Sequence, residues 1–456
     1  MATTYLTRTP SSAGNRKKFT ISMWVKRVKL GVDQWLVQAG ASGSEFDIRF
    51  TTSDQIRFTT WDGSNGYGMI TTRVFRDVSA WYHLVFQYDT AQATDTNRNK
   101  IYVNGEQISP SDTSAYNAGK HPPQNYDNPS WNNTTAFRIN DVTWTSSSPK
   151  DAVYSHIHHT DGYAYDASTF GSTDATSGIW KINTSPSVTY GTNGFFILKD
   201  GNTITDSSPN SNNFSLGGGT LTKTEDCPSN VFATLNSLAT SSYGTLIQGN
   251  NTVKGNTSTN SAETFSTLST NNDGKYYYEI KCTVVNGVDN PNFGFIQTAR
   301  GFRLQNGEPG LGGATSGSLD IRVQPDGKLF ENGAASGSAV ISTYTDGDIL
   351  GFAIDSDNGA FYVSKNGVWQ TSGNPESGAS RTGAIKTWSP TDSKVTEGQS
   401  VCIGVYNTSI ADANFGNGYF GTTAVTSAGT NASSNGIFEY DVPTGYTALS
   451  TKGLNL

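Results

Sequence analysis

Residues 19–26 read Phe-Thr-Ile-Ser-Met-Trp-Val-Lys, and apolar side chains occupy every odd-numbered position of this stretch. Polar residues fill most of the even-numbered positions, which is the period-2 pattern of a half-buried β-strand. Residues 81–88, Trp-Tyr-His-Leu-Val-Phe-Gln-Tyr, are apolar on nearly both faces and predict a central strand covered on both sides. Residues 100–108 predict a hairpin, because Asn104-Gly105 supplies the two positive-φ positions of a type I′ turn.

The same alternation returns in the second half of the chain. Tyr276, Tyr278, Ile280 and Cys282 occupy alternate positions, so Cys282 is expected to be a small buried thiol that points inward with the aromatic rings. No window has the period of an amphipathic helix. The predicted fold class is therefore all-β, with two β-sandwiches of the jelly-roll type. Further hairpin turns are predicted at residues 326–327, 355–359 and 366–367.

The segment between these β regions differs from both in composition. Ser, Thr, Asn and Gly dominate it, as in Leu216-Gly217-Gly218-Gly219, which indicates bridging loops with a few short strands rather than a core. The expected organisation is a first sandwich over residues 1–200, a polar bridging segment over 201–273, and a second sandwich with a C-terminal tail over 274–456.

Composition excludes several classes of protein. Aromatic residues make up 11% of the chain and the net charge is only −7, so a wholly disordered chain is excluded. The mildly acidic balance predicts no nucleic-acid partner, and no stretch approaches the roughly 18 apolar residues of a membrane span. The N-terminus has no apolar stretch behind basic residues, so no secretory signal is expected. The three widely spaced cysteines, Cys227, Cys282 and Cys402, are typical of a chain that folds in a reducing cytosol.

Strings in both β regions resemble known domain families. The first region resembles the laminin-G-like branch of the concanavalin A-like lectin/glucanase superfamily, in its early strand, its Trp-x-His strand and its Tyr-x-Asn-Gly hairpin. These strings are residues 19–25, 81–85 and 101–105. The second region resembles a SPRY-type sandwich, in its opening strand, its central hairpin and its closing hairpin. These strings are residues 274–279, 347–367 and 414–416.

The pieces between and after these strings resemble a group of tailed-bacteriophage virion proteins that pair the two domains. They occur in a fixed order at residues 168–171, 178–180, 190–195, 206–213, 226–236 and 443–449. The chain departs from that pattern at Cys227 and Val231, where a small polar residue and Asn are expected. The resemblance implies a non-enzymatic virion structural protein exposed on the particle, either a tail fibre or receptor-binding component or a capsid decoration protein.

The resemblance also implies partners and a location. The implied partners are neighbouring virion proteins and host cell-surface polysaccharide, and a homo-oligomer such as a trimer is expected from the virion setting. The implied location is the phage particle, after folding in the host cytoplasm. No cofactor and no membrane insertion are expected, and contact is expected through loops at the sandwich ends. The alternative is a glycan depolymerase, a glycoside hydrolase built on the concanavalin A-like scaffold.

A glycoside hydrolase of this superfamily needs a strand that carries three carboxylates at alternate or nearly alternate positions. Alternation directs the side chains into one cleft, where two carboxylates about 5–5.5 Å apart act as nucleophile and acid/base. Glu45 and Asp47 share a strand face, but Arg49 and Phe50 occupy the places where the third carboxylate belongs. The sequence therefore favours an exposed cross-strand cluster of Glu, Asp and Arg over a catalytic pair.

Histidines and one aspartate-rich turn are the remaining candidates for polar chemistry. His156 and His158 could project from one strand face toward a metal, but no Cys or second His pair stands nearby, so an exposed strand face is favoured. His83 is expected to be a hydrogen-bonded core histidine. Asp355 and Asp357 are similar to part of a calcium loop, yet a hairpin turn with side-chain hydrogen bonds is favoured. No metal site is therefore predicted.

Two loops carry aromatic rings flanked by polar side chains, and sugar recognition stacks pyranose rings on such flat groups. The first loop, residues 61–67, contains Trp61 and Tyr67. The second, residues 124–132, contains Tyr126 and Trp131. These four residues are the candidate ligand-binding site, and the alternative is that their rings merely pack beneath a long loop.

Overall fold

The computed structural model describes residues 4–144, 151–199, 203–256, 261–297, 320–331, 334–392 and 398–455. Over these ranges the chain is all-β, which confirms the predicted fold class, and its helical segments are short 3₁₀ turns. Within the described ranges, no helix is long and apolar enough to cross a lipid bilayer. The chain divides into two compact units, Met1–Lys223 and Thr224–Leu456.

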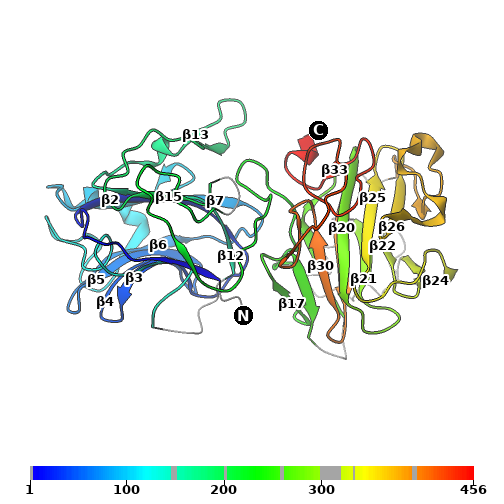
Figure 1. The fold of residues 1–456 in the computed structure, drawn as a ribbon, viewed down its shortest axis with the longest axis horizontal. Coiled ribbons are helices and arrows are strands. Elements are labelled where there is room, and N and C mark those ends of the chain that lie inside the picture. The colour runs from blue at the N-terminus through cyan, green and yellow to red at the C-terminus, as the bar shows by residue number, and fades with distance from the viewer. Residues whose placement is uncertain are drawn as a thin grey trace. The chain divides into compact units, whose positions relative to one another are not determined.

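The first unit is a sandwich of two antiparallel sheets (Figure 1). The eight-stranded sheet contains, in spatial order, β10 (Thr113–Ala115), β6 (Gly66–Val74), β5 (Gln55–Trp61), β4 (Ser44–Phe50), β3 (Gln34–Ala41), β11 (Phe137–Ile139), β1 (Tyr5–Arg8) and β16 (Ser215–Gly218). The six-stranded sheet contains β15 (Phe195–Ile197), β12 (Ala152–Asp161), β2 (Lys18–Arg27), β7 (Trp81–Asp89), β8 (Asn99–Val103) and β9 (Glu106–Gln107). A separate hairpin pairs β13 (Gly171–Thr173) with β14 (Trp180–Ile182).

The two strands that first indicated a sandwich lie side by side at the centre of the six-stranded sheet. Phe19, Ile21, Met23 and Val25 of β2 belong to the core between the sheets, as the alternation predicts. Strand β7 is covered on both sides, because Leu84 and Phe86 face that core while Val85 packs in a second cluster with Phe170 on the opposite face. The turn after β8 also agrees with prediction, since Asn104 and Gly105 have φ angles of 48° and 85°.

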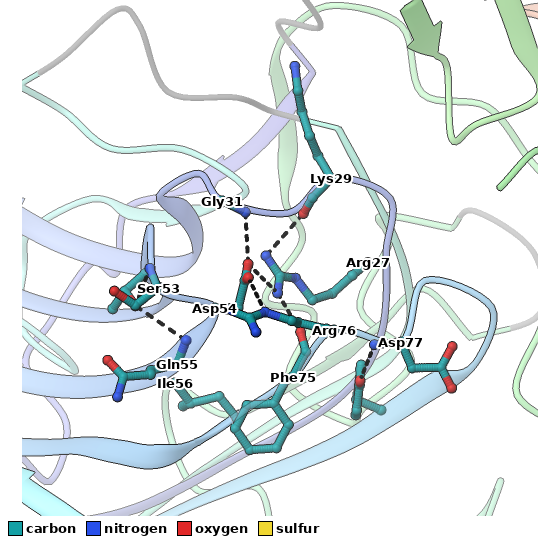
Figure 2. A network of polar contacts seen from close by, with 12 residues as sticks. Arg27, Lys29, Gly31, Ser53, Asp54, Gln55, Ile56, Phe75, Arg76 and Asp77 are labelled. Atoms are coloured by element: carbon teal, nitrogen blue, oxygen red, sulfur yellow. Dashed lines mark hydrogen bonds and ion pairs between the residues drawn. The ribbon is translucent and has the colours of Figure 1, made fainter. Parts of the chain in front are cut away.

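A buried ion pair fastens the end of β2 to the turn that precedes β5 (Figure 2). The Arg27 side chain is fully buried, and its Nη1 lies 3.1 Å from Oδ1 of Asp54. Asp54 also accepts hydrogen bonds from the backbone N–H of Gly31 at 2.8 Å and from Nε of Arg76 at 2.8 Å. The same guanidinium donates to the carbonyl oxygens of Phe75 and Lys29, so one carboxylate and one arginine join three chain segments, at residues 27–31, 54 and 75–76.

The second unit also contains two sheets, in which the strands pair antiparallel except for the parallel pair of β20 and β33. The larger has nine strands: β17 (Gly244–Ile247), β18 (Thr252–Gly255), β30 (Ile410–Asn414), β20 (Lys275–Val284), β25 (Ile349–Asp355), β26 (Ala360–Lys365) and β27 (Val368–Trp369) in order, with β28 (Lys386–Thr387) paired to β26 and β33 (Thr447–Ala448) to β20. The other contains β19 (Ala262–Ser269), β29 (Gln399–Val405), β21 (Asn292–Gln297), β22 (Asp320–Val323), β23 (Lys328–Glu331) and β24 (Ala334–Ala339). A short hairpin pairs β31 (Tyr419–Phe420) with β32 (Thr423–Ala424).

The core of the second unit confirms the alternation read from β20. Tyr278, Ile280 and Cys282 are fully buried between the two sheets, so Cys282 is the buried thiol that was expected. The turn at Asn366-Gly367 has φ angles of 49° and 80°, as a type I′ hairpin requires. On the other face of the larger sheet, Tyr277 packs with Phe438 from the C-terminal segment.

The boundary between the units differs from the predicted bridging segment. Within residues 203–256 and 261–273 the chain is divided between the two units: β16 pairs with β1 of the first unit, whereas β17, β18 and β19 join the sheets of the second. Leu235 and Val253 are fully buried in the core of the second unit. A few short strands were expected here, but not their membership in the two sandwiches, because short strands rich in Thr, Ser and Gly complete a sheet through backbone pairing, which a polar composition does not reveal.

Candidate functional site

Trp131, one of the four predicted ligand-binding residues, belongs to the core. Its side chain is 1% exposed and stacks on Phe137 with ring centroids 4.1 Å apart. The carboxamide Oδ1 of Asn128 accepts hydrogen bonds from the backbone N–H groups of Ser130 and Trp131, which turns the loop and directs the indole inward. The prediction that Trp131 contacts a ligand is therefore wrong, because a ring enclosed by the core cannot stack on a sugar.

Trp61 and Tyr67 come from one hairpin but lie on opposite faces of the eight-stranded sheet. Trp61 is paired with Gly66 and Thr60 with Tyr67, so the two rings point in opposite directions. Tyr67 packs edge-on against Tyr126, with centroids 5.3 Å apart, above core side chains. The space that Tyr67 lines is too narrow to admit a water molecule. These two tyrosines therefore cover the end of the sandwich.

The turn between β5 and β6 ties Tyr126 in place. Oδ1 of Asp62 accepts from the backbone N–H groups of Ser64 and Asn65, at 3.0 and 2.8 Å, and Oδ2 accepts from the Tyr126 hydroxyl at 3.2 Å. These hydrogen bonds lower the pKa of Asp62, while burial and the nearby Asp62 carboxylate raise the pKa of Tyr126. Tyr126 thus acts as a neutral donor that orders the turn beside Trp61.

The ring that does accompany Trp61 is Tyr116, which the sequence did not single out. Their centroids are 6.4 Å apart at an interplanar angle of 67°. Backbone hydrogen bonds from Tyr116 N to Gly68 O and from Ala118 N to Gly66 O hold the segment after β10 beside β6. A Cβ at Gly66 would lie 2.6 Å from the indole and 2.8 Å from the phenol ring, so only glycine lets both rings approach.

Charged side chains lie on the same outward face. Glu45 is paired with Trp61 across β4 and β5, and Asp47 with Thr59, so both carboxylates point away from the core. The Arg57 guanidinium lies 3.9 Å from the Tyr116 ring centroid and donates to Oδ2 of Asp47 at 3.1 Å. We call Trp61, Tyr116, Glu45 and Arg57 the Trp61 face.

The two carboxylates of the alternative hydrolase reading differ in accessibility. Asp47 is 1% exposed, and its Oδ2 accepts hydrogen bonds from both Arg57 and Thr59. Glu45 is partly exposed, and burial together with the neighbouring Asp47 raises its pKa. The cross-strand cluster of Glu, Asp and Arg is thus present, but the expectation that it is exposed fails at Asp47.

His83 is a buried, hydrogen-bonded residue of the first unit. His83 is fully buried: Trp180 Nε1 donates to its Nδ1 at 3.0 Å, and its Nε2 lies 2.9 Å from the Ser22 hydroxyl. This confirms the predicted core histidine, and burial lowers its pKa to about 3, which keeps the ring neutral. His83, Gly105 and Trp180 come from three motifs that lie far apart in the sequence. They meet here, because the Trp180 ring packs against Gly105 and donates to His83.

The pair His156 and His158 does not form the exposed strand face that the sequence favoured. The register of β12 shifts between Ser155 and His158, and His156 has a φ of 48°. His158 is 2% exposed because aromatic side chains cover this face: it stacks on Phe196 with centroids 3.8 Å apart and packs against Phe170. Within the described residues, no group of three or more His, Cys, Asp or Glu side chains could hold a metal ion.

Two aspartate-containing motifs are likewise occupied by internal hydrogen bonds. Asp355 is buried and accepts from the backbone N–H and the side-chain amide of Asn358, which confirms the predicted hairpin turn. Asp206 accepts from the backbone N–H groups of Phe196, Ser208 and Asn212. Asp206 therefore holds the loop that follows β15 against the first sandwich.

Comparisons with known proteins bear on the first unit. Residues 2–151 match the family model described as the concanavalin A-like lectin/glucanases superfamily, of the laminin G type. No curated protein matches the chain by sequence.

Solved structures align with parts or most of the chain at low identity. The SPRY domain of human HERC1 covers 39% of this chain and 96% of its own at 11% identity, with a TM-score of 0.29. Domains LG4-5 of the mouse laminin alpha1 chain cover 96% and 93% at 7% identity, with a TM-score of 0.28. The CBM40 of Ruminococcus gnavus IT-sialidase, solved with alpha2,3 sialyllactose, covers 28% and 73% at 13% identity, with a TM-score of 0.21. At such TM-scores these likenesses carry no argument about function.

The family match is therefore the comparison that bears weight, and it covers about a third of the chain. The matched residues hold both aromatic rings and both charged residues of the Trp61 face. Residues 2–151, which make up most of the first unit, are similar to the laminin-G-like type of the concanavalin A-like superfamily.

Proposed function

We propose that the protein is a non-enzymatic, carbohydrate-binding structural component of a tailed-phage virion, and that it contacts glycan through the Trp61 face. The observation that carries the binding proposal is the arrangement of two partly exposed rings, Trp61 and Tyr116, beside the carboxylate of Glu45 and the guanidinium of Arg57. Flat rings present an apolar surface to the C–H face of a pyranose, while the charged groups offer strong hydrogen-bond partners to its hydroxyls.

The contact would be shallow and its chemistry non-covalent. Trp61 would support one sugar ring, Arg57 would donate to hydroxyl or ring oxygens, and Glu45 would accept from hydroxyl groups. Asp47 would act as a positioning residue, because it fixes the Arg57 guanidinium from below. This division of roles uses the geometry as it stands and requires no cofactor.

The binding proposal predicts that Trp61→Ala weakens glycan binding by about 10- to 30-fold, the usual effect of removing a central aromatic contact. A glycan array identifies the saccharide that the wild-type chain binds, and titration calorimetry then compares the variants. Tyr163→Ala is the matched control, because Tyr163 is 41% exposed and lies in a loop after β12, away from this face. Equal affinity in Trp61→Ala and wild type would remove the Trp61 face from the proposal.

The hydrolase alternative makes a separate prediction. If Glu45 and Asp47 formed a catalytic pair, incubation with polysaccharide would release reducing ends, and Glu45→Gln would abolish that release. We expect no release from either protein, because Asp47 is enclosed by Arg57 and Thr59. Release that depends on Glu45 would overturn the non-enzymatic assignment.

The virion setting rests on the ordered strings that resemble tailed-phage virion proteins. In that setting the partners are neighbouring virion subunits and host surface polysaccharide, with a homo-oligomer such as a trimer as the assembly. The protein would fold in the host cytoplasm and act on the particle. Counting its copies on purified particles tests this: hundreds of copies indicate capsid decoration, a handful indicate a tail fibre or receptor-binding component, and none contradicts the virion assignment.

A further inference from the structure

Three arginines on the outward face of the eight-stranded sheet lie flat against aromatic rings. Arg57 covers Tyr116 at 3.9 Å from ring centroid to guanidinium carbon. Arg49 covers Trp35 at 4.7 Å, and Arg138 covers Tyr5 at 5.0 Å. We call these three arginine–aromatic pairs the guanidinium ladder.

Register places the ladder on one face, with a step along β3 from Trp35 to Gln38. Arg57 on β5 is paired with Arg49 on β4, and Arg49 with Trp35 on β3. Gln38, on the same face of β3, is paired with Arg138 on β11, which lies next to β1. Four strand-to-strand steps separate β5 from β1, so the ladder runs about 19 Å across the strands. It begins at the Trp61 face and continues well beyond it.

Each guanidinium already has a carboxylate partner. Arg57 lies 3.1 Å from Asp47, Arg49 lies 3.7 Å from Asp33, and Arg138 is paired with Asp141. The ladder therefore presents planar N–H donors with little net positive charge. An anionic polymer would gain little from such a surface, whereas hydroxyl and ring oxygens of an uncharged sugar need donors of this kind.

Two buried polar atoms beneath the ladder indicate that the face is incomplete without a ligand. Trp35 is 7% exposed and Gln38 is 0% exposed, yet Trp35 Nε1 and Gln38 Oε1 form no hydrogen bond with any described residue. Leaving a buried donor or acceptor unpaired costs about 1–3 kcal/mol. Trp35 Nε1 is a hydrogen-bond donor and Gln38 Oε1 is an acceptor. A hydroxyl group can accept from the first and donate to the second, so sugar hydroxyls that enter between the arginine side chains would supply both missing hydrogen bonds.

We infer that the ligand of this face is an uncharged polysaccharide chain that lies across the strands from β5 to β1, engaging the whole guanidinium ladder. This inference rests on the proposed glycan-binding function and adds the class and length of the glycan. The Trp61 face holds one part of the chain, and Arg49 and Arg138 hold the units that follow. A monosaccharide or disaccharide reaches only the first part.

The test compares chain lengths and charge on the full-length protein. Calorimetric titration with dextran, mannan and galactomannan first identifies an uncharged polysaccharide that binds. A short and a long oligosaccharide of the same repeat are then compared, and the long one should bind at least about tenfold more tightly. Affinity should stay within about twofold when NaCl is raised from low to high concentration, because an uncharged ligand is not screened. Alginate and heparin are the anionic comparators and should bind more weakly.

Variants separate this inference from the proposed function. Arg138→Gln and Arg49→Gln should each weaken binding of the long oligosaccharide several-fold and leave binding of the short one unchanged. The control is Arg16→Gln, because the Arg16 side chain is 33% exposed and is paired with Asp127, outside the guanidinium ladder. Trp61→Ala should weaken both lengths. Equal affinities for both lengths, or tight salt-sensitive binding of heparin or alginate, overturns the inference but leaves glycan binding standing. Binding to no polysaccharide overturns both proposals, and the wild-type length comparison holds even if a variant fails to fold.

Discussion

Replacing Asp54 with alanine is expected to destabilise the first unit by about 3–5 kcal/mol, because the change leaves Arg27 buried without its counter-charge. Three donors lose their acceptor at once: the guanidinium of Arg27, the backbone N–H of Gly31 and the side chain of Arg76 (Figure 2). Chemical denaturation followed by tryptophan fluorescence measures the loss, because seven of the nine tryptophans lie in this unit.

The control for this change is an aspartate with a similar but exposed ion pair. Asp127 lies 3.9 Å from Arg16 and its side chain is 48% exposed, so Asp127→Ala should change the free energy of unfolding by no more than about 0.5 kcal/mol. A loss below about 1 kcal/mol in Asp54→Ala would show that the Arg27–Asp54 pair does not hold these segments together.

The Asp54 site also predicts a dependence on acid. Hydrogen bonds from Arg76, Gly31 and Arg27 outweigh the effect of burial and lower the pKa of Asp54 below its usual value of 3.8. A lowered carboxyl pKa contributes stability above about pH 3.8, and the contribution is lost as the pH falls through the folded-state value. The difference in stability between wild type and Asp54→Ala should therefore shrink only in strong acid.

Replacing Glu279 is the second change with a large expected effect, and it acts on the second unit. Glu279 is fully buried on β20, where it accepts hydrogen bonds from the backbone N–H groups of Glu439 and Tyr440, both at 2.9 Å. The Tyr277 hydroxyl donates to it at 3.0 Å, and the Asn414 side chain at 3.4 Å. This one carboxyl group therefore fastens the C-terminal segment onto the face of the larger sheet.

The Glu279→Gln substitution should cost about 1–3 kcal/mol, because one half of the new amide can only donate and leaves a backbone N–H without an acceptor. Hydrogen exchange should increase first in the segment around residues 437–442. The matched control is Glu225→Gln, an exposed glutamate of the same unit, which should leave exchange unchanged. Equal hydrogen exchange of residues 437–442 in Glu279→Gln and Glu225→Gln would contradict this role of Glu279.

Glu279 also predicts that stability falls toward alkaline pH. Burial, with a smaller contribution from Glu439, raises the pKa of Glu279 from 4.5 to about 7 despite its four hydrogen-bond donors. A raised carboxyl pKa contributes stability that is fully present below about pH 4.5 and is lost as the pH rises through 7. Calorimetric melting of the second unit should shift downward between pH 5 and pH 8, and Glu279→Gln should remove that shift.

Local patterns predicted the fold class and the turns, but only part of the candidate site. Trp61 was found from its sequence because an aromatic residue beside polar turn residues marks a loop, and its face does carry charged side chains. Tyr116 carried no comparable signal, since it becomes part of the site only through its backbone pairing with β6. Trp131 stands among similar polar neighbours, yet hydrogen bonds from its own loop direct it into the core.

The prediction of a separate bridging segment over residues 201–273 differs from the structure for a related reason. Alternation identifies a strand only when apolar residues fill one face, and the strands within residues 201–273 contain Thr, Ser and Gly. Their membership in a sheet depends on partners far along the chain, such as β1 for β16 and β29 for β19. Composition describes the average of a segment, whereas pairing depends on individual backbone groups.

The sequence by itself determined the all-β class, the central strands β2 and β7 and the Asn-Gly hairpins, because periodicity and turn geometry are properties of neighbouring residues. Tertiary structure alone decided which rings and charges share a surface. Trp61, Tyr116, Arg49 and Arg138 meet on one face because the strands pair in one register, and a shift of one residue would turn each side chain to the opposite side of the sheet.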